Sequence, residues 1–595
     1  MPTVKLPLAG SPNQRGIDGD AALALSQDQR FLNCTFDVVT NAITGKSTFY
    51  VQKRPGWGQS SIPAAGSAST GLIKPQSFTA TLAAFGETNS VIYFGTSSVG
   101  TITGRALHFT ETLISNVGCV AIKSSDGTGW YYMDGAKDVT AYTMDGNNST
   151  TVTDIKIAGV AGTAGLYPGQ KLTAASNITA GTRIVSVNSG AFTAVLDTIT
   201  TGGAFNDLAV TKEPIAKIID ADFVTSGTYI GAFAPMDGYL FYPDDSGYVN
   251  NSDQNSVSSY TANARIAVQG APDPTVGVAI QKNILVAFGT TSNEKFQNTN
   301  FTSGSPLQPA KSQIEHYGAL DQRSITQLED DIFYVSTPSE GDVGVYMMRG
   351  LNSTRISTSI VDKILGTAAQ SGAIYASSFR MGGYPYATFY ISTASDGPAS
   401  NILLENGDIM LMETTPGGNV LMEDTAGQSS SYSMTMAYNA KLNLWSEWDA
   451  SEATFIDSSG TGTSNQLVAT SRCDTAGYVY TINPVADGEL YTDAGVAFTM
   501  EIRTAKIDHG TNERKVVTSV ELIGSDSSAG NTPYLSYSDD DYQTWSTPRA
   551  FNTSRARPFL TRCGSYEGQR AYKITDSSDA PFRAQALKIT YELGN

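Results

Sequence analysis

Three histidines, His108, His316 and His509, are the side chains of this 595-residue chain best suited to acid–base or metal chemistry near neutral pH. They share no short spacing, so neither an H-E-x-x-H zinc site nor a local catalytic triad can be read from them. Isolated histidines of this kind are usually surface or packing residues. We therefore predict no catalytic residue, no metal ligand and no cofactor-binding residue.

Motifs for phosphate binding and nucleophilic catalysis are missing as well. The sequence contains no G-x-x-x-x-G-K-S/T phosphate loop. Gly95-Thr96-Ser97-Ser98-Val99 approaches the G-x-S-x-G nucleophile elbow, but Val99 stands where a second glycine must allow the tight turn. This stretch is more simply a serine-rich loop, and the chain is predicted not to be an enzyme.

Acidic residues cluster at Asp244-Asp245, Asp330-Asp331 and Asp539-Asp540-Asp541. A glycosidase needs two carboxylates about 5 to 9.5 Å apart, a distance that sequence does not supply. None of the clusters fits the D-x-D-x-D-G calcium loop. We expect turn caps and solvated corners, with cation binding at Asp539–Asp541 as the minor alternative.

Four cysteines, Cys34, Cys119, Cys473 and Cys563, lie far apart and form no C-x-x-C pair. Assembly in a reducing cytosol is the simplest interpretation. Each is expected to be a small buried hydrophobe.

The composition favours an all-β protein with several modules. Only 16% of the residues are charged, while 57 are glycine. Ala21–Phe31 and Thr358–Thr367 are the modest helix candidates. No signal peptide or membrane-spanning helix is expected, because the start lacks an apolar core and no window approaches 18 apolar residues.

The net charge of −18 argues against a protein that grips nucleic acid, and we find no basic patch with interleaved aromatic residues. A wall that DNA must slide past would suit such a charge. The alternative is that acidity simply keeps a large β protein soluble.

Short runs of alternating or apolar residues, closed by Gly, Ser, Thr, Asn or Asp, predict many strands without long helices between them, which is typical of a propeller or a sandwich. The clearest predicted strands are Thr79–Phe85, Val91–Phe94, Ala106–Phe109, Val117–Ile122, Trp130–Met133, Val152–Ile157, Gly181–Val187, Ile284–Phe288, Asp331–Val335 and Val343–Met348.

Changes in residue pattern along the chain divide it into five segments. We predict an arm and the first part of the body at 1–149, an inserted small β module at 150–212, the continued body at 213–399, a projecting β-hairpin repeat at 400–430, and the closing part at 431–595. The linker Asp145–Asn148 marks the first boundary. The repeat is built on Leu403-Leu404-Glu405, Leu411-Met412-Glu413 and Leu421-Met422-Glu423.

Ser538–Trp545 resembles the Asp-box, S-x-D-x-G-x-T-W, with Tyr542 where glycine is usual. In that motif the Ser and Asp brace a hairpin turn and the Trp packs beneath it, so the predicted role is structural.

The chain contains a series of short sequence phrases: Phe288-Gly289 with Glu294, Ile314 with Gly318, Ser324-Ile325, Arg355-Ile356-Ser357-Thr358, Leu6-Pro7-Leu8, Gln29–Asn33, Lys53-Arg54-Pro55-Gly56-Trp57, Tyr438-Asn439, Trp445–Trp448, Ser538–Trp545 and Arg562-Cys563-Gly564. Their order resembles that in the packaged-DNA stabilisation protein, or tail nozzle, of short-tailed bacteriophages (podoviruses; tail tubular protein B-like). The resemblance covers most of the chain outside the two insertions.

The resemblance implies a propeller body of about six blades and a structural role in the virion tail, after assembly in the cytoplasm of the host bacterium. The chain would form a ring, by resemblance a hexamer, below portal and adaptor, and would meet a tail needle, plug or fibre. The ring would extend the DNA channel, retain the packaged genome and allow its ejection, without specific DNA binding and without membrane insertion. A propeller glycan hydrolase and a receptor-binding tail or fibre protein are the alternatives. Sugar released from a host glycan would favour the first of these.

Overall fold

Alternating runs closed by turn residues form strands throughout the computed structural model, as the composition predicts. The structure describes residues 3–8, 29–40, 47–59, 65–223, 231–301, 304–310, 314–337, 343–371, 373–392, 433–448, 454–458, 467–472, 474–482, 491–524, 531–555 and 557–594. Within these ranges the helical elements are α2 (Ser359–Ser371) and the 3-10 turn η1 (Gln322–Ser324). α2 confirms the helix predicted at Thr358–Thr367. None of the described helices is long and apolar enough to cross a membrane.

Five antiparallel four-stranded sheets stand alone in the described part of the chain. The first contains β6 (Ser69–Ile73), β7 (Leu82–Phe85), β8 (Val91–Phe94) and β9 (Ser97–Thr101); the second β20 (Ala234–Met236), β21 (Tyr239–Pro243), β22 (Tyr248–Ser252) and β23 (Tyr260–Ala267); the third β24 (Thr275–Gln281), β25 (Ile284–Gly289), β26 (Asn293–Asn298) and β27 (Leu307–Pro309); the fourth β28 (Ile325–Leu328), β29 (Asp331–Ser336), β30 (Gly344–Arg349) and β31 (Asn352–Arg355); the fifth β36 (Phe455–Ser458), β37 (Leu467–Thr470), β38 (Val479–Ile482) and β5 (Gly58–Gln59).

Two more four-stranded units belong to larger sheets. They are β10 (Ala106–Ile114), β11 (Val117–Ser124), β12 (Gly129–Met133) and β19 (Ala204–Lys217), and β32 (Ala373–Met381), β33 (Tyr384–Ser392), β34 (Ser433–Asn439) and β35 (Leu444–Trp448). The first strands of all these units contact one another in the cyclic order β6, β10, β20, β24, β28, β32, β36 and back to β6.

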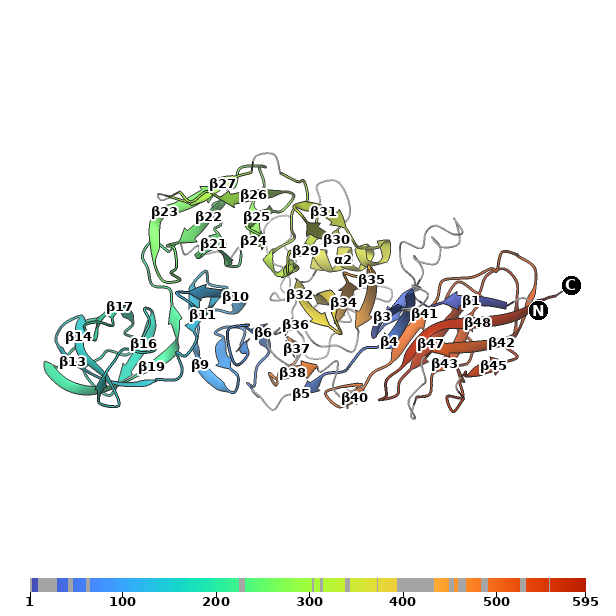
Figure 1. The fold of residues 1–595 in the computed structure, drawn as a ribbon, viewed down its shortest axis with the longest axis horizontal. Helices are drawn as coiled ribbons and strands as arrows, with labels where there is room; N and C mark the ends of the chain where they lie inside the picture. Colours follow the sequence, from blue (N-terminus) through green and yellow to red (C-terminus); the bar gives the residue numbers. More distant parts are fainter. Residues whose placement is uncertain are drawn as a thin grey trace, which may run out of the picture.

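These contacts close a β-propeller, which confirms the predicted class (Figure 1). The prediction of about six blades is not confirmed: the described strands give five free-standing sheets, or seven units once the two shared ones are counted. The chain closes the ring with a strand from its N-terminal part, because β5 pairs with β38 through Gln59 and Tyr480.

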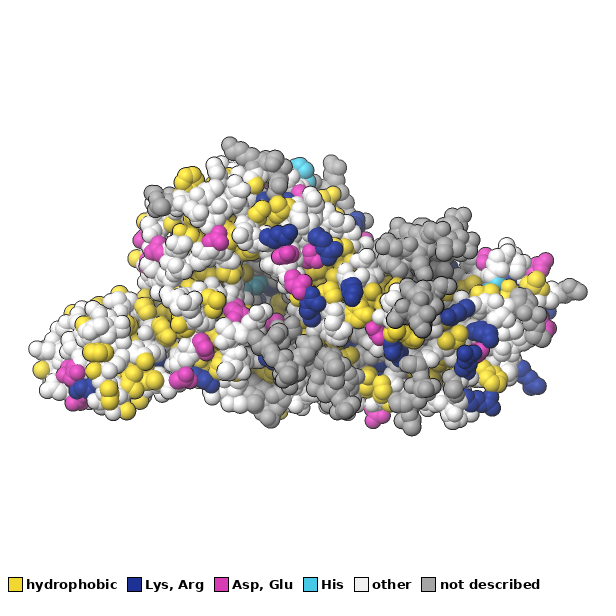
Figure 2. Space-filling view, viewed as in Figure 1, with side chains coloured by type: hydrophobic (Ala, Val, Ile, Leu, Met, Phe, Trp, Pro, Cys, Tyr) yellow, Lys and Arg dark blue, Asp and Glu magenta, His cyan; other side chains and the backbone are white. Residues whose placement is uncertain are grey.

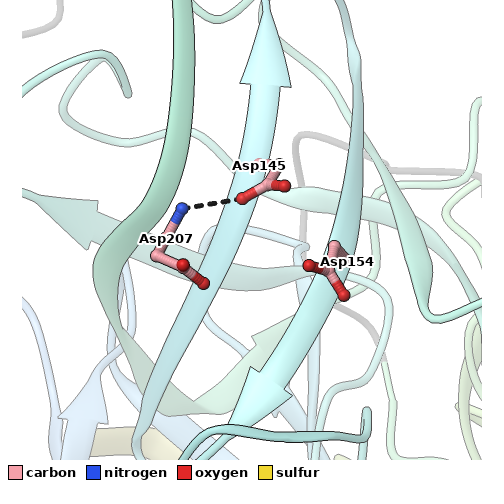
Figure 3. A group of neighbouring side chains, drawn as sticks. All are labelled: Asp145, Asp154 and Asp207. Carbon is pink, nitrogen blue, oxygen red and sulfur yellow. Dashed lines mark hydrogen bonds between the residues drawn. The ribbon is translucent and has the colours of Figure 1, made fainter.

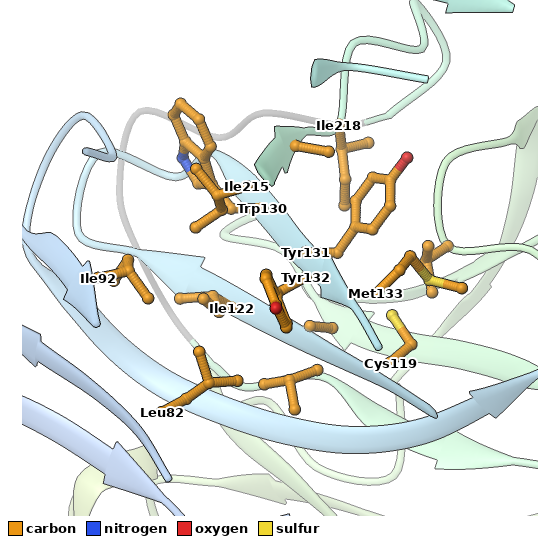
Figure 4. Packing of buried hydrophobic residues seen from close by; sticks show 14 of the residues in the cluster. Leu82, Ile92, Cys119, Ile122, Trp130, Tyr131, Tyr132, Met133, Ile215 and Ile218 are labelled. Carbon is orange, nitrogen blue, oxygen red and sulfur yellow. The ribbon is translucent and has the colours of Figure 1, made fainter. Parts of the chain in front are cut away.

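Large apolar side chains fill the space between neighbouring blades. Figure 4 shows the cluster in which Leu82 and Ile92 of the first blade face Ile122, Trp130 and Tyr132 of the next. All five are at most 1% exposed, and each buried side chain of this size contributes about 1.5–3 kcal/mol. The inter-blade packing therefore carries much of the stability of the ring.

The inserted module is a separate lobe beside the second blade (Figure 1). It contains β13 (Ala141–Asn147), β14 (Thr151–Ile157), β15 (Val160–Ala161), β16 (Gln170–Ala174), β17 (Ile184–Asn188), β18 (Thr193–Leu196) and the first half of β19. It has its own apolar cluster, centred on side chains such as Met144, Leu172 and Leu196. It differs from the prediction in its start, because Asp145–Asn147 is the end of β13 and Asn148 begins the β13–β14 turn, so this stretch is not a linker.

The two ends of the module lie next to each other, since Ala141 pairs with Thr211 and the Lys212 amide donates to the Thr140 carbonyl at 3.1 Å. Closing such a gap with a short linker costs little. Replacing residues 141–211 with a Gly/Ser linker is therefore expected to leave a folded, soluble body. Scanning calorimetry should still show a cooperative transition for the deletion variant, and its loss would refute the independence of the module.

The chain's two ends build a β-sandwich outside the ring (Figure 1). One sheet contains β1 (Thr3–Pro7), β3 (Cys34–Thr40), β4 (Ser47–Lys53), β42 (Lys515–Gly524), β45 (Phe559–Thr561), β46 (Ser565–Tyr566) and β48 (Arg583–Leu593); the other contains β2 (Arg30–Leu32), β41 (Met500–Arg503), β43 (Tyr534–Ser538), β44 (Arg549–Ala550) and β47 (Ala571–Asp576). A hairpin of β39 (Thr492–Asp493) and β40 (Val496–Ala497) precedes β41.

The sandwich changes the interpretation of both ends of the chain. Residues from 3–53 pair with residues from 500–593 across one core, so the N-terminal segment does not lead directly into a blade. The Asp-box-like hairpin after β43 lies in the sandwich too. The hairpin repeat at 400–430, most of the helix candidate Ala21–Phe31, and Cys473 lie outside the described residues; Phe31 itself is in β2.

Candidate functional site

The joint between propeller and sandwich is a continuous hydrogen-bonded sheet. β2 of the sandwich pairs in parallel with β35 of the propeller through Leu32 and Glu447. The Arg30 guanidinium donates to the Glu447 carboxylate at 2.9 Å, and the Trp448 indole donates to the Cys34 carbonyl at 3.2 Å. Strand pairing, an ion pair and a buried indole thus fix one body against the other.

Arg54 is the central side chain of this joint. It is 1% exposed, and its guanidinium forms a bidentate pair with Asp493 of the β39–β40 hairpin. Its Nε donates to the Asn33 side chain at 3.0 Å, and its guanidinium lies 4.0 Å from the centroid of the Phe498 ring. One buried cation therefore connects Asn33, 21 residues before it, with the segment around Asp493, 439 residues after it.

Gly56 and Trp57 complete the joint. A Cβ on Gly56 would lie 2.1 Å from the Thr492 carbonyl oxygen, so the backbones approach more closely than any side chain allows. Trp57 packs edge-on against Trp448 with ring centroids 6.5 Å apart. The phrase Lys53–Trp57 is thus explained by packing between the two bodies and not by chemistry.

A cavity of about 270 Å³ lies at the centre of the propeller, lined by η1 and by the inner strands β6, β10, β28, β32 and β36. His108 of β10 lines it, and burial together with the nearby Arg323 lowers the pKa of His108 to about 3. The imidazole is therefore neutral at physiological pH.

Other polar groups of this axial cavity have hydrogen-bond partners within the protein. Arg323 donates to Asp321 at 2.7 and 2.9 Å and lies 5.3 Å from the Tyr375 ring. The Ser378 hydroxyl donates to the Gln327 carbonyl at 2.7 Å, not to a base. Among the described lining residues we find no activated nucleophile, so the cavity can hold water or a small polar molecule but has no evident catalytic geometry.

The acidic clusters brace the backbone, as predicted for turn caps, or pair with cations. Asp244 is buried and accepts the amides of Ser246 and Tyr248 at 2.9 and 3.0 Å. Asp331 accepts from Arg349 at 2.9 Å. Asp330, beside it, contributes its carbonyl to the Gln281 amide at 2.9 Å.

The Asp539–Asp541 cluster does not converge on a cation. Asp539 pairs with the buried Arg570, and Asp541 pairs with Lys506. Asp540 accepts from the Thr544 hydroxyl and amide, which lowers its pKa to about 2. Tyr542 adopts a left-handed φ of 67° where the Asp-box has glycine. The hairpin therefore keeps the bracing role of the motif without a metal site.

One other carboxylate group in the described residues could hold a metal by distance, and sequence analysis missed it. Asp145, Asp154 and Asp207 have oxygens within 4.8 Å of one another, brought together by β13, β14 and β19 (Figure 3). The Lys156 ammonium lies 2.6 Å from Asp154 and 2.9 Å from Asp207. A lysine thus already compensates this exposed cluster.

The remaining candidate residues have packing roles. Cys34, Cys119 and Cys563 are buried free thiols, and burial raises the pKa of each. His509 stacks on Tyr591 with ring centroids 4.6 Å apart, and burial lowers its pKa. His316 is exposed. The three histidines lie in three different parts of the structure.

Charge is divided unequally along the sequence. Residues 61–490 contain 20 Lys and Arg against 39 Asp and Glu, a net charge of −19, whereas 1–60 together with 491–595 contain 18 against 17, a net charge of +1. Figure 2 shows Lys and Arg side chains gathered over the sandwich at the right-hand end. The overall charge of −18 hides this separation.

The structure corrects the expectation that no basic patch with aromatic residues exists. Arg549, Arg555, Arg557 and Arg562 fall in one stretch with no acidic residue between Asp541 and Glu567, and Phe551 and Phe559 lie among them. Arg555, Arg557, Arg562 and Phe559 are exposed. A local charge count along the sequence could have found this stretch.

The family model described as "Bacteriophage P22 Gp10, beta-propeller" matches residues 178–381. The match runs from the module through the second, third and fourth free-standing sheets into β32. It covers about a third of the chain, including the phrases between Phe288 and Thr358. It supports a phage stabilisation protein, hence a structural component of the virion, built on a β-propeller.

Residues of the matched phrases have structural roles. A Cβ on Gly318 would lie 2.3 Å from the Thr290 carbonyl carbon, so only glycine fits there. Glu294 accepts the Gln269 and Gly270 amides at 3.0 and 2.9 Å, and Asp321 and Ser324 form a reciprocal cap on η1. The phrases therefore describe turns between blades.

The solved structures that match this chain share little sequence with it. They include Raptor from Chaetomium thermophilum (TM-score 0.34, 9% identity, 73% of this chain and 29% of that chain), the Pan2 WD40 domain from Neurospora crassa (0.31, 7%, 74% and 97%) and an exo-beta-1,3-galactanase from Phanerochaete chrysosporium (0.23, 9%, 61% and 96%). These likenesses say nothing about function. No curated protein matches the chain.

Proposed function

We propose that this chain is the tail nozzle protein of a short-tailed bacteriophage. Six copies form a ring below the portal and its adaptor, extend the DNA channel, retain the packaged genome and let it out on infection. The observation that carries the proposal is the match of residues 178–381 to the phage propeller family. The role is mechanical and not enzymatic.

The joint supports this role. A nozzle must transmit load between its parts without hinging, and the β2–β35 strand pair, the Arg30–Glu447 ion pair and the bond from the Trp448 indole to the Cys34 carbonyl link propeller and sandwich. Contacts with the adaptor above and with a tail needle, plug or fibre below are part of the proposal. So is assembly in the bacterial cytoplasm before incorporation into the tail.

The acidic propeller supports a channel wall that does not hold DNA. Residues 61–490 carry a net charge of −19 in each copy. At physiological salt the Debye length is about 8 Å, so such a field acts only on DNA within a narrow channel. Retention then comes from a constriction or a separate plug.

Electron microscopy of the purified protein and of labelled virions tests the proposal. Six chains of 63.0 kDa give a particle of about 378 kDa, and class averages should show a closed ring with a central channel. Gold-labelled antibody should bind at the tail, below the portal vertex. Label confined to fibre tips, or a protein that stays monomeric alone and is absent from virions, would contradict the proposal.

A further inference from the structure

The outer face of the larger sandwich sheet carries two neighbouring rows of side chains, and the first row contains two lysines. Lys5 on β1 lies directly opposite Lys588 on β48, which lies opposite Glu521 on β42, which lies opposite Phe559 on β45. Residues paired in this way point to the same face. This face is the outer one, because the adjacent residues Leu6, Leu587 and Leu560 are buried in the sandwich core.

The second row consists of hydroxyl side chains. Thr3, Thr590, Ser519 and Thr561 follow one another across the same four strands, each two residues from a member of the first row. Side chains two residues apart on a strand share a face. The cations therefore stand beside a row of hydrogen-bond donors about 14 Å wide, given a strand spacing of about 4.8 Å.

Two arginines, Arg555 and Arg557, contact side chains of this surface at the β45 edge, and a third, Arg562, is exposed at the end of β45. Arg555 lies over the exposed Phe559 ring at 5.0 Å, Arg557 has a side chain that is 75% exposed, and Arg562 follows β45 directly. We name Lys5, Arg555, Arg557, Arg562 and Lys588 the basic face.

One carboxylate serves two of these cations. Glu521 accepts from Lys588 at 3.1 Å and lies 3.7 Å from Arg557. Lysines placed directly opposite each other on neighbouring strands repel, and such a pair is unfavourable without an anion above it. The charge of the face is thus incompletely balanced from within the sheet.

We propose that the basic face binds the phosphate backbone of duplex DNA without reading its sequence. Lys, Arg, Ser and Thr are the side chains that contact phosphates, whereas protein–protein interfaces are depleted in Lys and Ser and enriched in aromatic residues. Together with the hydroxyl row, the basic face has two lysines, three arginines, four hydroxyl residues and one exposed aromatic ring. This composition fits phosphates better than a second copy's acidic propeller.

The basic face adds a contact that the proposed channel lacks. The virion role supplies only the identity of the polyanion; the binding itself needs neither ring nor virion. DNA repelled by the propeller would be held transiently at the sandwich. The propeller would thus repel, and the sandwich attract, the same duplex.

Salt dependence of binding tests the inference on the purified full chain. With a fluorescein-labelled 20-bp duplex, a plot of log affinity against log NaCl concentration should have a slope of about −4.5 for five contacts. The wild-type protein should therefore lose about 500-fold in affinity between 50 and 200 mM NaCl. The variant Arg555→Gln/Arg557→Gln/Arg562→Gln should lose only about 10-fold over the same range.

A matched triple variant on the propeller provides the control. Arg265, Arg349 and Arg380 are exposed there, and Arg265→Gln/Arg349→Gln/Arg380→Gln removes the same charge from the chain. It should keep the wild-type slope. A second sandwich variant, Lys5→Gln/Lys588→Gln, should reduce the steepness by about 2.

Three results would overturn the inference. The first is no binding to the duplex at 25 mM NaCl, and the second is equal slopes for the two triple variants. The third is a change in the mass of the DNA-free protein when the basic face is substituted, because this would assign the face to a contact between copies. If antibody to the protein labels the virion tail but the DNA-binding test fails, only the inference about the basic face is wrong. If the protein binds DNA as expected but is absent from virions, only the proposed nozzle role is wrong.

Discussion

Replacing Arg54 with alanine is expected to destabilise the sandwich by about 3–5 kcal/mol, because the change leaves the Asp493 carboxylate without its buried partner. The Asn33 amide oxygen and the Phe498 ring lose the same cation. Thermal unfolding should show the sandwich transition lowered by about 10 °C. The propeller transition should move less, since its blades pack on one another.

Two further variants separate the ion pair from the packing. Arg54→Lys keeps the charge but not the fork that engages both Asp493 oxygens, so we expect it to recover less than half of the loss. Arg105→Ala breaks an ion pair with the half-exposed Glu87 and should cost under about 1 kcal/mol. Equal effects for Arg54→Ala and Arg105→Ala would show that the joint depends on strand pairing alone.

Local pattern was sufficient to predict strands and the class of fold. Val91–Phe94 coincides with β8, and Asp331–Val335 lies within β29, because both runs are apolar and closed by turn residues. The helix at α2 followed from apolar residues at helical spacing. The predicted absence of a catalytic motif remains a prediction.

Contacts between distant segments could not be predicted from the sequence. Arg54 and Asp493 are 439 residues apart, and Lys5 and Lys588 meet because the first and last strands of the sandwich pair. Neither pairing leaves a trace in local periodicity. The two ends of the sequence were therefore interpreted as an arm and closing blades, although they form one sandwich. The residues of the basic face lie near both ends of the sequence, so the sequence does not show them together.

The module contains a buried lysine whose charge opposes folding. Lys212 of β19 is 6% exposed; its ammonium donates to the Gly165 carbonyl and lies 5.4 Å from the Tyr142 ring. Burial lowers the pKa of Lys212 to about 7, and Asp138, the nearby carboxylate, opposes this shift only in part. The Lys212 amine is therefore protonated less readily in the folded module than in the unfolded chain.

The sign of the pH dependence follows from this difference. Between pH 7 and about 10 the unfolded chain binds a proton that the folded module does not, so stability rises with pH by up to about 1.4 kcal/mol per unit. Below pH 7 Lys212 is protonated in both states, and the full free-energy cost of burying its charge is present. Lys212→Met should therefore stabilise the module by about 2–4 kcal/mol at pH 7, and this gain should vanish near pH 10.

Calorimetry of the module transition between pH 6.5 and 10, for wild type and variant, measures this gain directly. Lys171→Met is the matched control, because the Lys171 ammonium lies at the module surface, 2.9 Å from Glu213, and its loss should change stability by under about 1 kcal/mol. A gain at Lys212 that does not depend on pH would mean that methionine simply packs better. A loss of stability at pH 7 would mean that the bond to the Gly165 carbonyl outweighs the cost of burying the amine. Only a gain that declines as the pH rises identifies a buried charge, which the module carries at the junction where β19 passes from its own sheet into the propeller blade.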